Sequence, residues 1–301
     1  MLNYENDREL KTEIMRLMRE KKFSLNKLGQ ALGISTSALS QWQKGDYKGD
    51  NEKINEVVRT FIKREYDKAA APKIKIGFVE TTVAKKILEA LKICHLENEI
   101  SVCYGDAGIG KTTAVTEYVR HNTDVLYILA NLSYTTKVLF AELHQKLGMD
   151  GSGSINSMLN DCLNKLRGSN KMIIIDQAEY LPSRSLDLLR ALNDEGNGAG
   201  IFLVGLPRLV SNVVGKRGEL KQLFSRIGIT VRLETISAAD VEKILVSAKL
   251  KTDHSELFFD SSKRNTRALT KLINRAHQIA QINEREIDER VIAKAASTLI
   301  V

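Results

Sequence analysis

Five short apolar runs recur through the middle of the chain. They are ISVCY (100–104), DVLYILA (124–130), MIIID (172–176), GIFLVGL (200–206) and GITVRL (228–233). Stretches with a helical period separate the first four runs, at Thr113–Asn122, Thr135–Leu147, Ser154–Arg167 and Ser183–Asn193. Runs that are apolar on both faces are typical of strands buried on both sides of a parallel sheet. The alternation of strands and helices therefore predicts an α/β architecture.

Both ends of the chain have helical patterns instead. Residues 67–79, around Pro72, show no helical period and are interpreted as a linker. After the last apolar run the helical period returns, at Ala238–Lys249, Asn265–Gln281 and Glu286–Leu299. We therefore predict four parts: an all-α domain (1–66), the linker (67–79), an α/β core (80–234) and a C-terminal helical domain (235–301).

The stretch FSLNKLGQALGISTSALSQWQKGDY (23–47) has the pattern of a helix-turn-helix. Leu25, Leu28 and Leu32 form one apolar face, and Ser35 can cap a second helix. The arrangement resembles lambda-repressor-like DNA-binding domains. That resemblance implies that DNA contacts come from the exposed face of the second helix and its end: Thr36, Ser37, Ser40, Gln41, Gln43, Lys44 and Lys48. A helical oligomerisation or partner-docking domain is the alternative.

The side chains on this helix also indicate how DNA would be read. Trp42 is expected to lie in the core, because its neighbours alternate with the polar face. The reading face carries short polar side chains and no arginine between Thr36 and Lys44. Such a face favours weak or shape-tolerant base readout over a tight operator.

Charge is uneven along the 301 residues, which carry a formal net charge of +8. Residues 69–206 hold 14 Lys/Arg against 15 Asp/Glu, whereas residues 207–301 hold 17 against 11. Basic ends around a neutral middle favour a polyanionic partner, with simple solubility as the alternative. The three cysteines form no CxxC pair, the N-terminus is too polar for a signal peptide, and no apolar run approaches about 20 residues. A reducing cytoplasm and no membrane span are expected.

The most specific chemical motif is GDAGIGKT, which follows the first apolar run and precedes a helical pattern. It fits the phosphate-binding loop G-x-x-x-x-G-K-[ST], whose backbone N–H groups cradle phosphate oxygens at a helix N-terminus. Lys111 is expected to reach the β- and γ-phosphates of ATP, and the Thr112 hydroxyl to ligate Mg²⁺. The predicted nucleotide-binding residues are Gly105, Asp106, Ala107, Gly108, Ile109, Gly110, Lys111, Thr112 and Thr113.

A second acidic position completes this site. Asp176 ends the apolar run MIIID, 65 residues after Lys111, with one predicted strand and its helices between them. A carboxylate at the end of a buried strand in this position is expected to hold the same Mg²⁺.

The order of these motifs resembles the AAA+ ATPases. More closely, the chain is similar to the family of ATP-dependent target-DNA selectors of DNA transposons, the transposition protein B family of Mu-like phages. KGDYKGDNEKINEVVRTFI, GFVET, GDAGIGKT, IIIDQAEYL and LFSRI carry the resemblance, which covers nearly the whole chain. It implies an AAA+ P-loop fold with a helical lid, double-stranded DNA and a transposase as partners, and an ATP-dependent homo-oligomeric filament.

The resemblance also implies roles for residues outside the phosphate loop. Arg226 is similar to an arginine finger offered to a neighbouring subunit's ATP, with Arg217 as its rival. Arg267 is similar to the second sensor arginine, which contacts the γ-phosphate from the lid. For Arg226 and Arg267 alike, a surface arginine is the alternative. Thr135 and Lys137 lie in NLSYTTK (131–137), which resembles a loop that holds the DNA backbone; an ordinary helix cap is the alternative.

Two positions depart from the family pattern. Gln177 stands where a catalytic glutamate is expected, and Leu206 stands where a polar sensor follows the fourth strand. A carboxamide can orient water but cannot take its proton, and loss of a general base commonly costs ~10²–10⁴ in rate. Glu179 is the nearest carboxylate, but it is expected to project elsewhere unless a helical turn brings it round. The sequence therefore predicts retained ATP binding, slow hydrolysis and long-lived filaments.

Other functions remain open from the sequence alone. An ATP-switched helix-turn-helix regulator would use the same two modules on one operator. An AAA+ replication initiator or helicase loader is a third hypothesis. A metabolic P-loop kinase is disfavoured, because no acceptor-substrate site is apparent and the N-terminal module would be unexplained.

Overall fold

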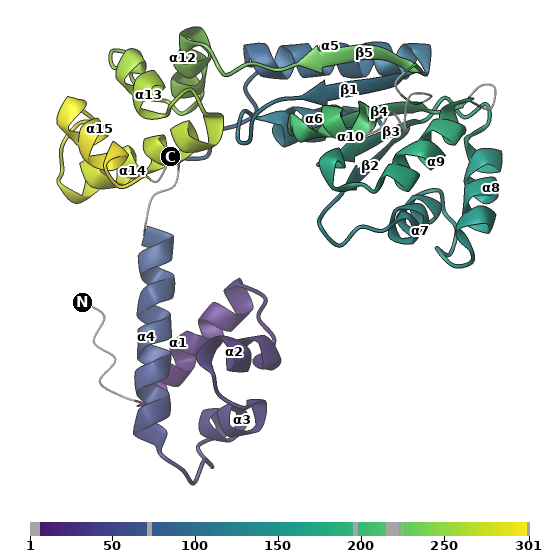
Figure 1. Cartoon of the computed structure of the whole chain (residues 1–301). Helices are drawn as coiled ribbons and strands as arrows, with labels where there is room; N and C mark the ends of the chain where they lie inside the picture. The colour runs from purple at the N-terminus through teal and green to yellow at the C-terminus, as the bar shows by residue number, and fades with distance from the viewer. Residues whose placement is uncertain (1–6, 71–73, 195–197, 215–222, 224, 300–301) are drawn as a thin grey trace. The chain divides into compact units, whose positions relative to one another are not determined.

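The chain folds into two compact units, divided between residues 73 and 74. The computed structural model describes residues 7–70, 74–194, 198–214, 223 and 225–299. The division falls inside the predicted linker (67–79). The helix before it nevertheless continues to Ala70, so the prediction is wrong for residues 67–70, which are helical (Figure 1).

The N-terminal unit contains four helices among its described residues. They are α1 (Asp7–Glu20), α2 (Leu25–Leu32), α3 (Thr36–Lys44) and α4 (Asn51–Ala70). A left-handed Gly33 ends α2, and the Ser35 side chain accepts the Ala38 N–H to cap α3. Trp42 is fully buried with Leu39, and its Nε1 donates to Asn55 Oδ1 at 2.9 Å. The prediction that Trp42 belongs to the core is confirmed.

The second unit is built on a five-stranded parallel sheet of order β2-β3-β4-β1-β5. Its strands are β1 (Ile100–Tyr104), β2 (Val125–Leu129), β3 (Met172–Asp176), β4 (Gly200–Gly205) and β5 (Ile227–Arg232). The five predicted runs are these strands to within one residue. The order places β4 between β1 and β3, so the loops after these three strands meet at one edge of the sheet (Figure 1).

The last strand differs from the prediction that every run is buried on both faces. In β5, Ile227, Ile229 and Val231 are half-buried, while the residues between them are exposed. The strand lies at the edge of the sheet beside β1, where Val231 packs against the cluster on the α5 side and Ile227 against the cluster on the opposite face.

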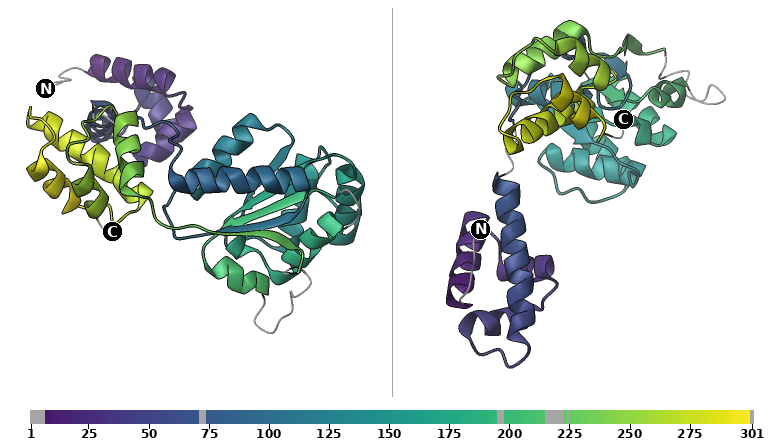
Figure 2. Two further views of the ribbon diagram at one scale, coloured as in Figure 1. Left: turned by 90° about the horizontal axis from the view of Figure 1, so that it is seen from above. Right: turned by 90° about the vertical axis from the view of Figure 1, so that its left-hand side faces the viewer.

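Helices cover both faces of the sheet, which gives three layers (Figure 2). One face packs against α5 (Thr82–Glu97) and α6 (Lys111–His121). The opposite face packs against α7 (Thr136–Lys146), α8 (Ile155–Leu166) and α9 (Ser183–Asp194). A 3-10 turn, η1 (Ala178–Tyr180), follows β3, and α10 (Arg208–Val214) follows β4.

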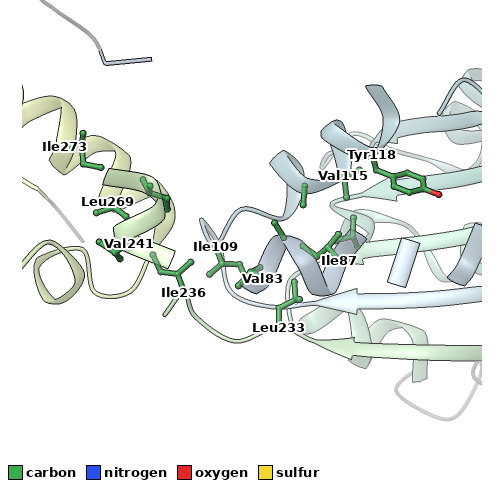
Figure 3. Packing of buried hydrophobic residues seen from close by; sticks show 14 of the residues in the cluster. Val83, Ile87, Ile109, Val115, Tyr118, Leu233, Ile236, Val241, Leu269 and Ile273 are labelled. Carbon is green, nitrogen blue, oxygen red and sulfur yellow. The ribbon is translucent and has the colours of Figure 1, made fainter. Parts of the chain in front are cut away.

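The C-terminal helices form a lid that shares a core with the α5 side of the sheet. They are α12 (Ala238–Ser247), α13 (Ser255–Ser261), α14 (Thr266–Ile282) and α15 (Glu289–Ala296). Ile236 and Val241 continue the cluster that contains Val83 and Ile109 (Figure 3). This continuity holds the lid against the loop that follows β1.

A buried carboxylate joins the lid to the core at two helix N-termini. Asp240 caps α12 by accepting the Ser237 N–H at 3.0 Å, and it also accepts the Thr82 N–H of α5 at 2.7 Å. Burial by itself would raise the pKa of Asp240, but the hydrogen bonds from Ser237 and Thr82 outweigh it and hold that pKa below its usual value.

The hydrogen bonds of Asp240 to Ser237 and Thr82 predict a pH-dependent loss of stability. Asp240→Asn should lower the free energy of unfolding at pH 7 by about 1.5–3 kcal/mol, the usual worth of hydrogen bonds to a charged group. A depressed carboxyl pKa stabilises the fold above the unfolded-state pKa, about 3.9, and that contribution is lost as the pH falls through the folded-state value.

The difference between wild type and Asp240→Asn should therefore be full at pH 7 and shrink below about pH 4. Calorimetry of the full chain at pH 7, 5 and 3 measures it, with the exposed Asp253→Asn as the control. A difference that stays constant down to pH 3 would contradict stabilisation by the charged Asp240 carboxylate.

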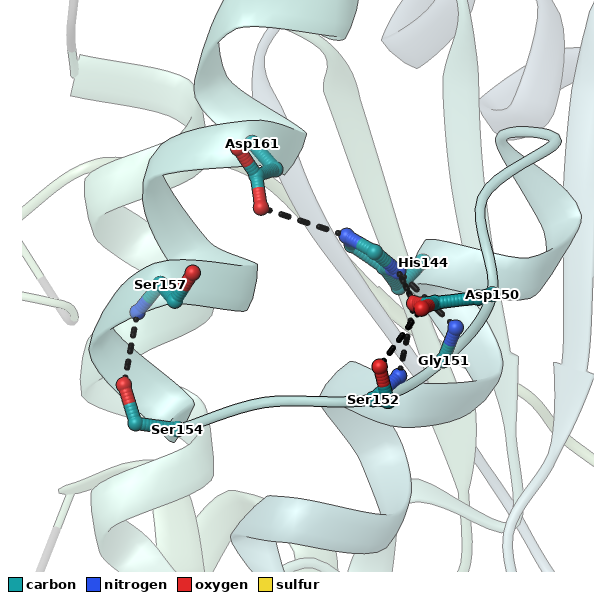
Figure 4. A network of polar contacts seen from close by, with 7 residues as sticks. All are labelled: His144, Asp150, Gly151, Ser152, Ser154, Ser157 and Asp161. Carbon is teal, nitrogen blue, oxygen red and sulfur yellow. Dashed lines mark hydrogen bonds and ion pairs between the residues drawn. The ribbon is translucent and has the colours of Figure 1, made fainter.

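The glycine-rich loop between α7 and α8 is tied to a buried histidine (Figure 4). His144 Nδ1 accepts the Gly151 N–H at 3.0 Å, and Nε2 faces Asp161 Oδ2 of α8 at 3.4 Å. Because Nδ1 is the acceptor, Nε2 carries the proton in the neutral ring. The ring thereby links both helices to the connecting loop.

Within the described residues, no helix has the length and apolar character needed to cross a bilayer.

Candidate nucleotide site

The phosphate loop connects β1 to α6, as the sequence predicts. Gly110 precedes α6 with φ of 102°, and no side chain among the described residues caps this helix N-terminus. The first N–H groups of α6 are therefore left for an anion. Gly108 also has a positive φ, and a Cβ there would lie 2.5 Å from Asn265 Oδ1 of the lid.

Lys111 lies inside this loop, half-buried. Its Nζ donates to the carbonyl oxygens of Gly105 and Asp106, each at 2.7 Å. Burial lowers the pKa of Lys111, opposed chiefly by the nearby carboxylate of Glu179. The ammonium thus has a negatively charged neighbour and lies within the loop where the phosphates of a nucleotide would be bound.

Asp176 is the last residue of β3 and is almost fully buried. Its Oδ1 accepts the Gln177 N–H at 2.8 Å, and its Oδ2 accepts the Tyr127 hydroxyl at 3.2 Å. Both oxygens keep a lone pair, and the exposed Thr112 lines the same cavity. A carboxylate, a hydroxyl and substrate phosphates are the ligands that Mg²⁺ prefers, so these residues fit the predicted metal.

The segment after β3 decides the orientation of Glu179, which the sequence made conditional on a helical turn. Gln177 adopts a left-handed conformation with φ of 57°, and η1 begins directly after it. This turn brings Glu179 back to the site, where Gln177 and Glu179 both line the cavity. The helical turn on which the sequence made this placement depend is therefore present, and it begins at Gln177 in a backbone conformation that non-glycine residues seldom take.

The Glu179 carboxylate lies over the carboxyl end of β4. Its Oε2 accepts the Leu206 N–H at 3.1 Å, and a Cβ on Gly205 would lie only 2.2 Å from that oxygen. Leu206 offers no polar side chain, as predicted, but its backbone N–H holds the carboxylate. A carboxylate thus lies close to the position where a polar sensor was expected.

The lid supplies cations on one face of α14. Arg267 and Lys271, one turn apart, both line a cavity of about 520 Å³ together with the phosphate loop, Asp176 and Glu179. The cavity brings together the predicted Lys111, Thr112, Asp176 and Arg267. Lys271 was missed from the sequence, although its i, i+4 spacing from Arg267 could have indicated it.

Asn265 connects this lid helix to the phosphate loop. Its Oδ1 accepts the Arg267 and Ala268 N–H groups at 3.1 Å, and its Nδ2 donates to the Ala107 carbonyl at 2.7 Å. The Arg267 N–H also donates to the Gly108 carbonyl at 2.9 Å. The Asn265 amide and the Gly108 carbonyl therefore both fix the start of α14, where Arg267 lies.

Asn265→Asp separates the two roles of that amide. Aspartate keeps the helix cap but cannot donate to Ala107, so we expect ATP affinity to fall roughly 3- to 10-fold for the lost hydrogen bond. The melting temperature should stay close to that of wild type, whereas Asn265→Ala should lower both. Titration with a fluorescent ATP analogue and thermal melts distinguish them; unchanged affinity in Asn265→Asp would contradict this role.

A smaller apolar cavity of about 180 Å³ adjoins the phosphate loop. It lies between the segment that precedes α5, the loop and the lid, and Gly110 and Thr113 are shared with the larger cavity. Its apolar side chains are Ile76, Phe78, Val79, Ile109 and Ile244. The flat faces of the nucleotide's base fit such an apolar lining. These residues were missed because they are far apart in the sequence.

Arg226 lies away from this cavity. It directly precedes β5, so it lies at the amino ends of the parallel strands, whereas the phosphate loop follows the carboxyl end of β1. Its Nε is 3.3 Å from Asp194 Oδ1. Its side chain is mostly exposed. It cannot contact the nucleotide of its own protomer, so contact with a neighbour's ATP stays a prediction, with a surface arginine paired to Asp194 as the alternative. Arg217, the rival, lies outside the described residues.

The candidate DNA-contact residues of α3 divide into two groups. Ser37, Gln41 and Lys44 are exposed at helical spacing, and Lys48 is exposed after the helix. Together they make one polar surface.

Thr36, Ser40 and Gln43 are half-buried instead. The Thr36 hydroxyl donates to Asn26 Oδ1, and Gln43 Nε2 faces Met18 Sδ at 3.7 Å. The prediction of an exposed face is wrong for these three, because their side of α3 turns toward the unit's other helices.

The segment 131–137 at the start of α7, which holds Thr135 and Lys137, includes an ordinary helix cap. Thr135 Oγ1 accepts the Val138 N–H at 3.3 Å and caps the helix. Lys137 is exposed beside it. The cap occupies the Thr135 side chain, while Lys137 stays a candidate for contact with phosphate.

Known proteins resemble this chain in sequence and in fold. A family model described as AAA domain matches residues 95–212. The chain is 27% identical over 290 residues to the ATP-dependent target DNA activator B of Escherichia phage D108, covering 95% of this chain and 92% of that protein. It is 29% identical to the protein of the same name in Escherichia phage Mu, covering 79% and 77%. The Mu-like prophage FluMu DNA transposition protein B of Haemophilus influenzae is 25% identical, covering 76% and 82%.

Solved structures agree on the fold. The Aeropyrum pernix ORC2 protein, in ADPNP–ADP complexes, matches with a TM-score of 0.60 and 18% identity, covering 74% of this chain and 70% of that one. The Thermotoga maritima RuvB Holliday junction branch migration motor matches with a TM-score of 0.50 and 17% identity, covering 72% and 68%. The predicted AAA+ P-loop ATPase fold, with a five-stranded parallel sheet and a helical lid, is confirmed.

Proposed function

We propose that this chain, which is similar over most of its length to the target DNA activator B proteins of phages D108 and Mu, is an ATP-dependent DNA-binding protein that activates target DNA for a transposase. The observation that carries the proposal is the cavity where Lys111, Asp176 and Glu179 of the core meet Arg267 of the lid. A triphosphate bound there would contact both the core and the lid, so ATP can control the position of the lid relative to the core.

The residues in this cavity can perform slow hydrolysis of ATP. A water molecule attacks the γ-phosphorus while Glu179 takes its proton, and the bond to the β–γ bridging oxygen breaks with its electron pair leaving on ADP. Lys111 and Arg267 stabilise the charge on the phosphate oxygens. Thr112 and Asp176 would hold Mg²⁺, which would supply positive charge that neutralises part of the charge on the phosphate oxygens.

The placement of Arg226 supports assembly into a homo-oligomer. Because it lies at the opposite edge of the sheet from its own phosphate loop, head-to-tail stacking would bring it to a neighbour's ATP. Such a heterologous contact repeats into a helical filament when it does not close into a ring. ATP at the junction would then hold neighbouring protomers together until it is hydrolysed.

DNA contact is assigned to the polar surface of α3 and to Lys137. Ser37, Gln41, Lys44 and Lys48 are exposed, and none is an arginine that could read guanine in the bidentate way. Mostly phosphate-directed contacts would give affinity that falls steeply with salt and shows little sequence preference.

Electron micrographs of the protein with random-sequence DNA test this function. Filaments on any DNA with ATP, and not with ADP, are expected. Discrete complexes on one sequence would favour an operator-binding regulator instead. A strand-transfer assay with the cognate transposase then shows whether the coated DNA is used as a target; no stimulation of transfer would contradict target activation.

A further inference from the structure

Helix α10 and Leu206, two residues before it, contact Glu179 at three points. The Asn212 side chain donates to the Glu179 backbone carbonyl at 2.9 Å. The Leu206 N–H, just before the helix, binds carboxylate oxygen Oε2 at 3.1 Å. The third contact comes from Arg208, at the start of α10, toward the other carboxylate oxygen.

Arg208 is placed by an aromatic ring. Its guanidinium carbon lies 4.6 Å from the centre of the Tyr180 ring, within the range of a cation–π contact. From there its Nη2 is 3.9 Å from Glu179 Oε1. That separation is too long for a hydrogen bond but makes Arg208 an ion-pair partner of Oε1. The arginine side chain is 51% exposed, whereas the Glu179 side chain is 3% exposed.

We propose that Arg208 is a positioning residue that restrains Glu179 and thereby slows ATP hydrolysis. The inference rests on the proposed function, in which Glu179 takes the proton of the attacking water. Oε2 already accepts the Leu206 N–H, whereas Oε1 accepts no hydrogen bond from a described residue, so Oε1 is the more open oxygen for that water. Arg208 lies 3.9 Å from Oε1 and competes with that water for it.

This arrangement gives slow turnover a physical cause other than a missing base. The base is present, but its free oxygen faces a guanidinium fixed on Tyr180. Because half of the arginine side chain is exposed, it can leave the carboxylate without unfolding the core. Hydrolysis would speed up when Arg208 moves away from Oε1.

Steady-state kinetics of full-length variants test the restraint. Arg208→Gln removes the charge and should raise kcat roughly 3- to 10-fold, with the KM for ATP within about twofold of wild type. Tyr180→Leu, which removes the ring that positions Arg208, should also raise kcat. Arg208→Lys keeps the charge without the planar stacking and should give an intermediate kcat. Arg184→Gln, an exposed arginine on the neighbouring α9, should leave kcat unchanged.

A double variant shows whether Arg208 acts through Glu179. In a Glu179→Gln background, Arg208→Gln should add no rate, because there is no carboxylate left to restrain. A rate increase in that background, a decrease of kcat in Arg208→Gln alone, or a kcat equal to that of Arg184→Gln would each overturn the inference. Absence of ATP binding in the wild-type protein would instead contradict the proposed function.

Discussion

Replacement of Lys111 by alanine should weaken ATP binding by roughly 30-fold or more and abolish ATP-dependent assembly on DNA. The Lys111 ammonium lies within the phosphate loop, 2.7 Å from two loop carbonyls, next to the carboxylates of Glu179 and Asp176. Truncating one partner of a buried, hydrogen-bonded charge pair costs about 2–5 kcal/mol, and 1.4 kcal/mol is a factor of ten in affinity.

The same substitution also tests whether ATP is what drives assembly. Affinity is measured with a fluorescent ATP analogue, and assembly by sedimentation with random-sequence DNA. Lys85→Ala, at an exposed position on α5, is the matched loss of one lysine and should behave like wild type. If Lys111→Ala still bound ATP and formed filaments, the cavity described here would not be the nucleotide site.

Glu179→Gln should lower kcat by ~10²–10⁴ while ATP affinity stays close to that of wild type. A carboxamide has nearly the same shape and can still accept the Leu206 N–H, but it cannot take a proton from water. Filaments of this variant should persist on DNA after free ATP is removed, since the bound nucleotide is lost only slowly. Single-turnover hydrolysis and filament lifetime measure the two effects.

Gly205→Ala provides an independent route to the same result. A Cβ at this position would lie 2.2 Å from Glu179 Oε2, so the carboxylate must shift. We expect a loss of kcat that adds little to the loss in Glu179→Gln when the two are combined. Glu89→Gln, at an exposed position on α5, is the control for the loss of one carboxylate. Normal turnover in Glu179→Gln would show that another group accepts the proton.

The strands and the phosphate loop could be predicted because both depend on nearby residues. MIIID (172–176) is β3, and ISVCY (100–104) is β1 without change of boundaries. Apolar runs of this length, separated by helical patterns, leave few arrangements other than a parallel sheet. The loop motif has a definite local geometry, so its prediction needed no knowledge of distant residues.

Glu179 could not be placed in this way. Its position depends on a left-handed Gln177, which a sequence pattern does not indicate for a non-glycine residue. It also depends on Gly205 and Leu206, which lie 26 and 27 residues further along the chain. The half-buried side of α3 could not be predicted for a similar reason, because Gln43 turns toward Met18 of another helix.

The sequence by itself determined the elements, their order and the chemistry of the phosphate loop, because periodicity and short motifs act over a few residues. The tertiary structure alone decided which side chains meet at the site: that Glu179 lies over β4, that Asn265 and Lys271 come from the lid, and that Arg226 lies at the far edge of the sheet. The physical reason is that a parallel sheet aligns the carboxyl ends of strands distant in sequence, and only that alignment sets the distances between their side chains.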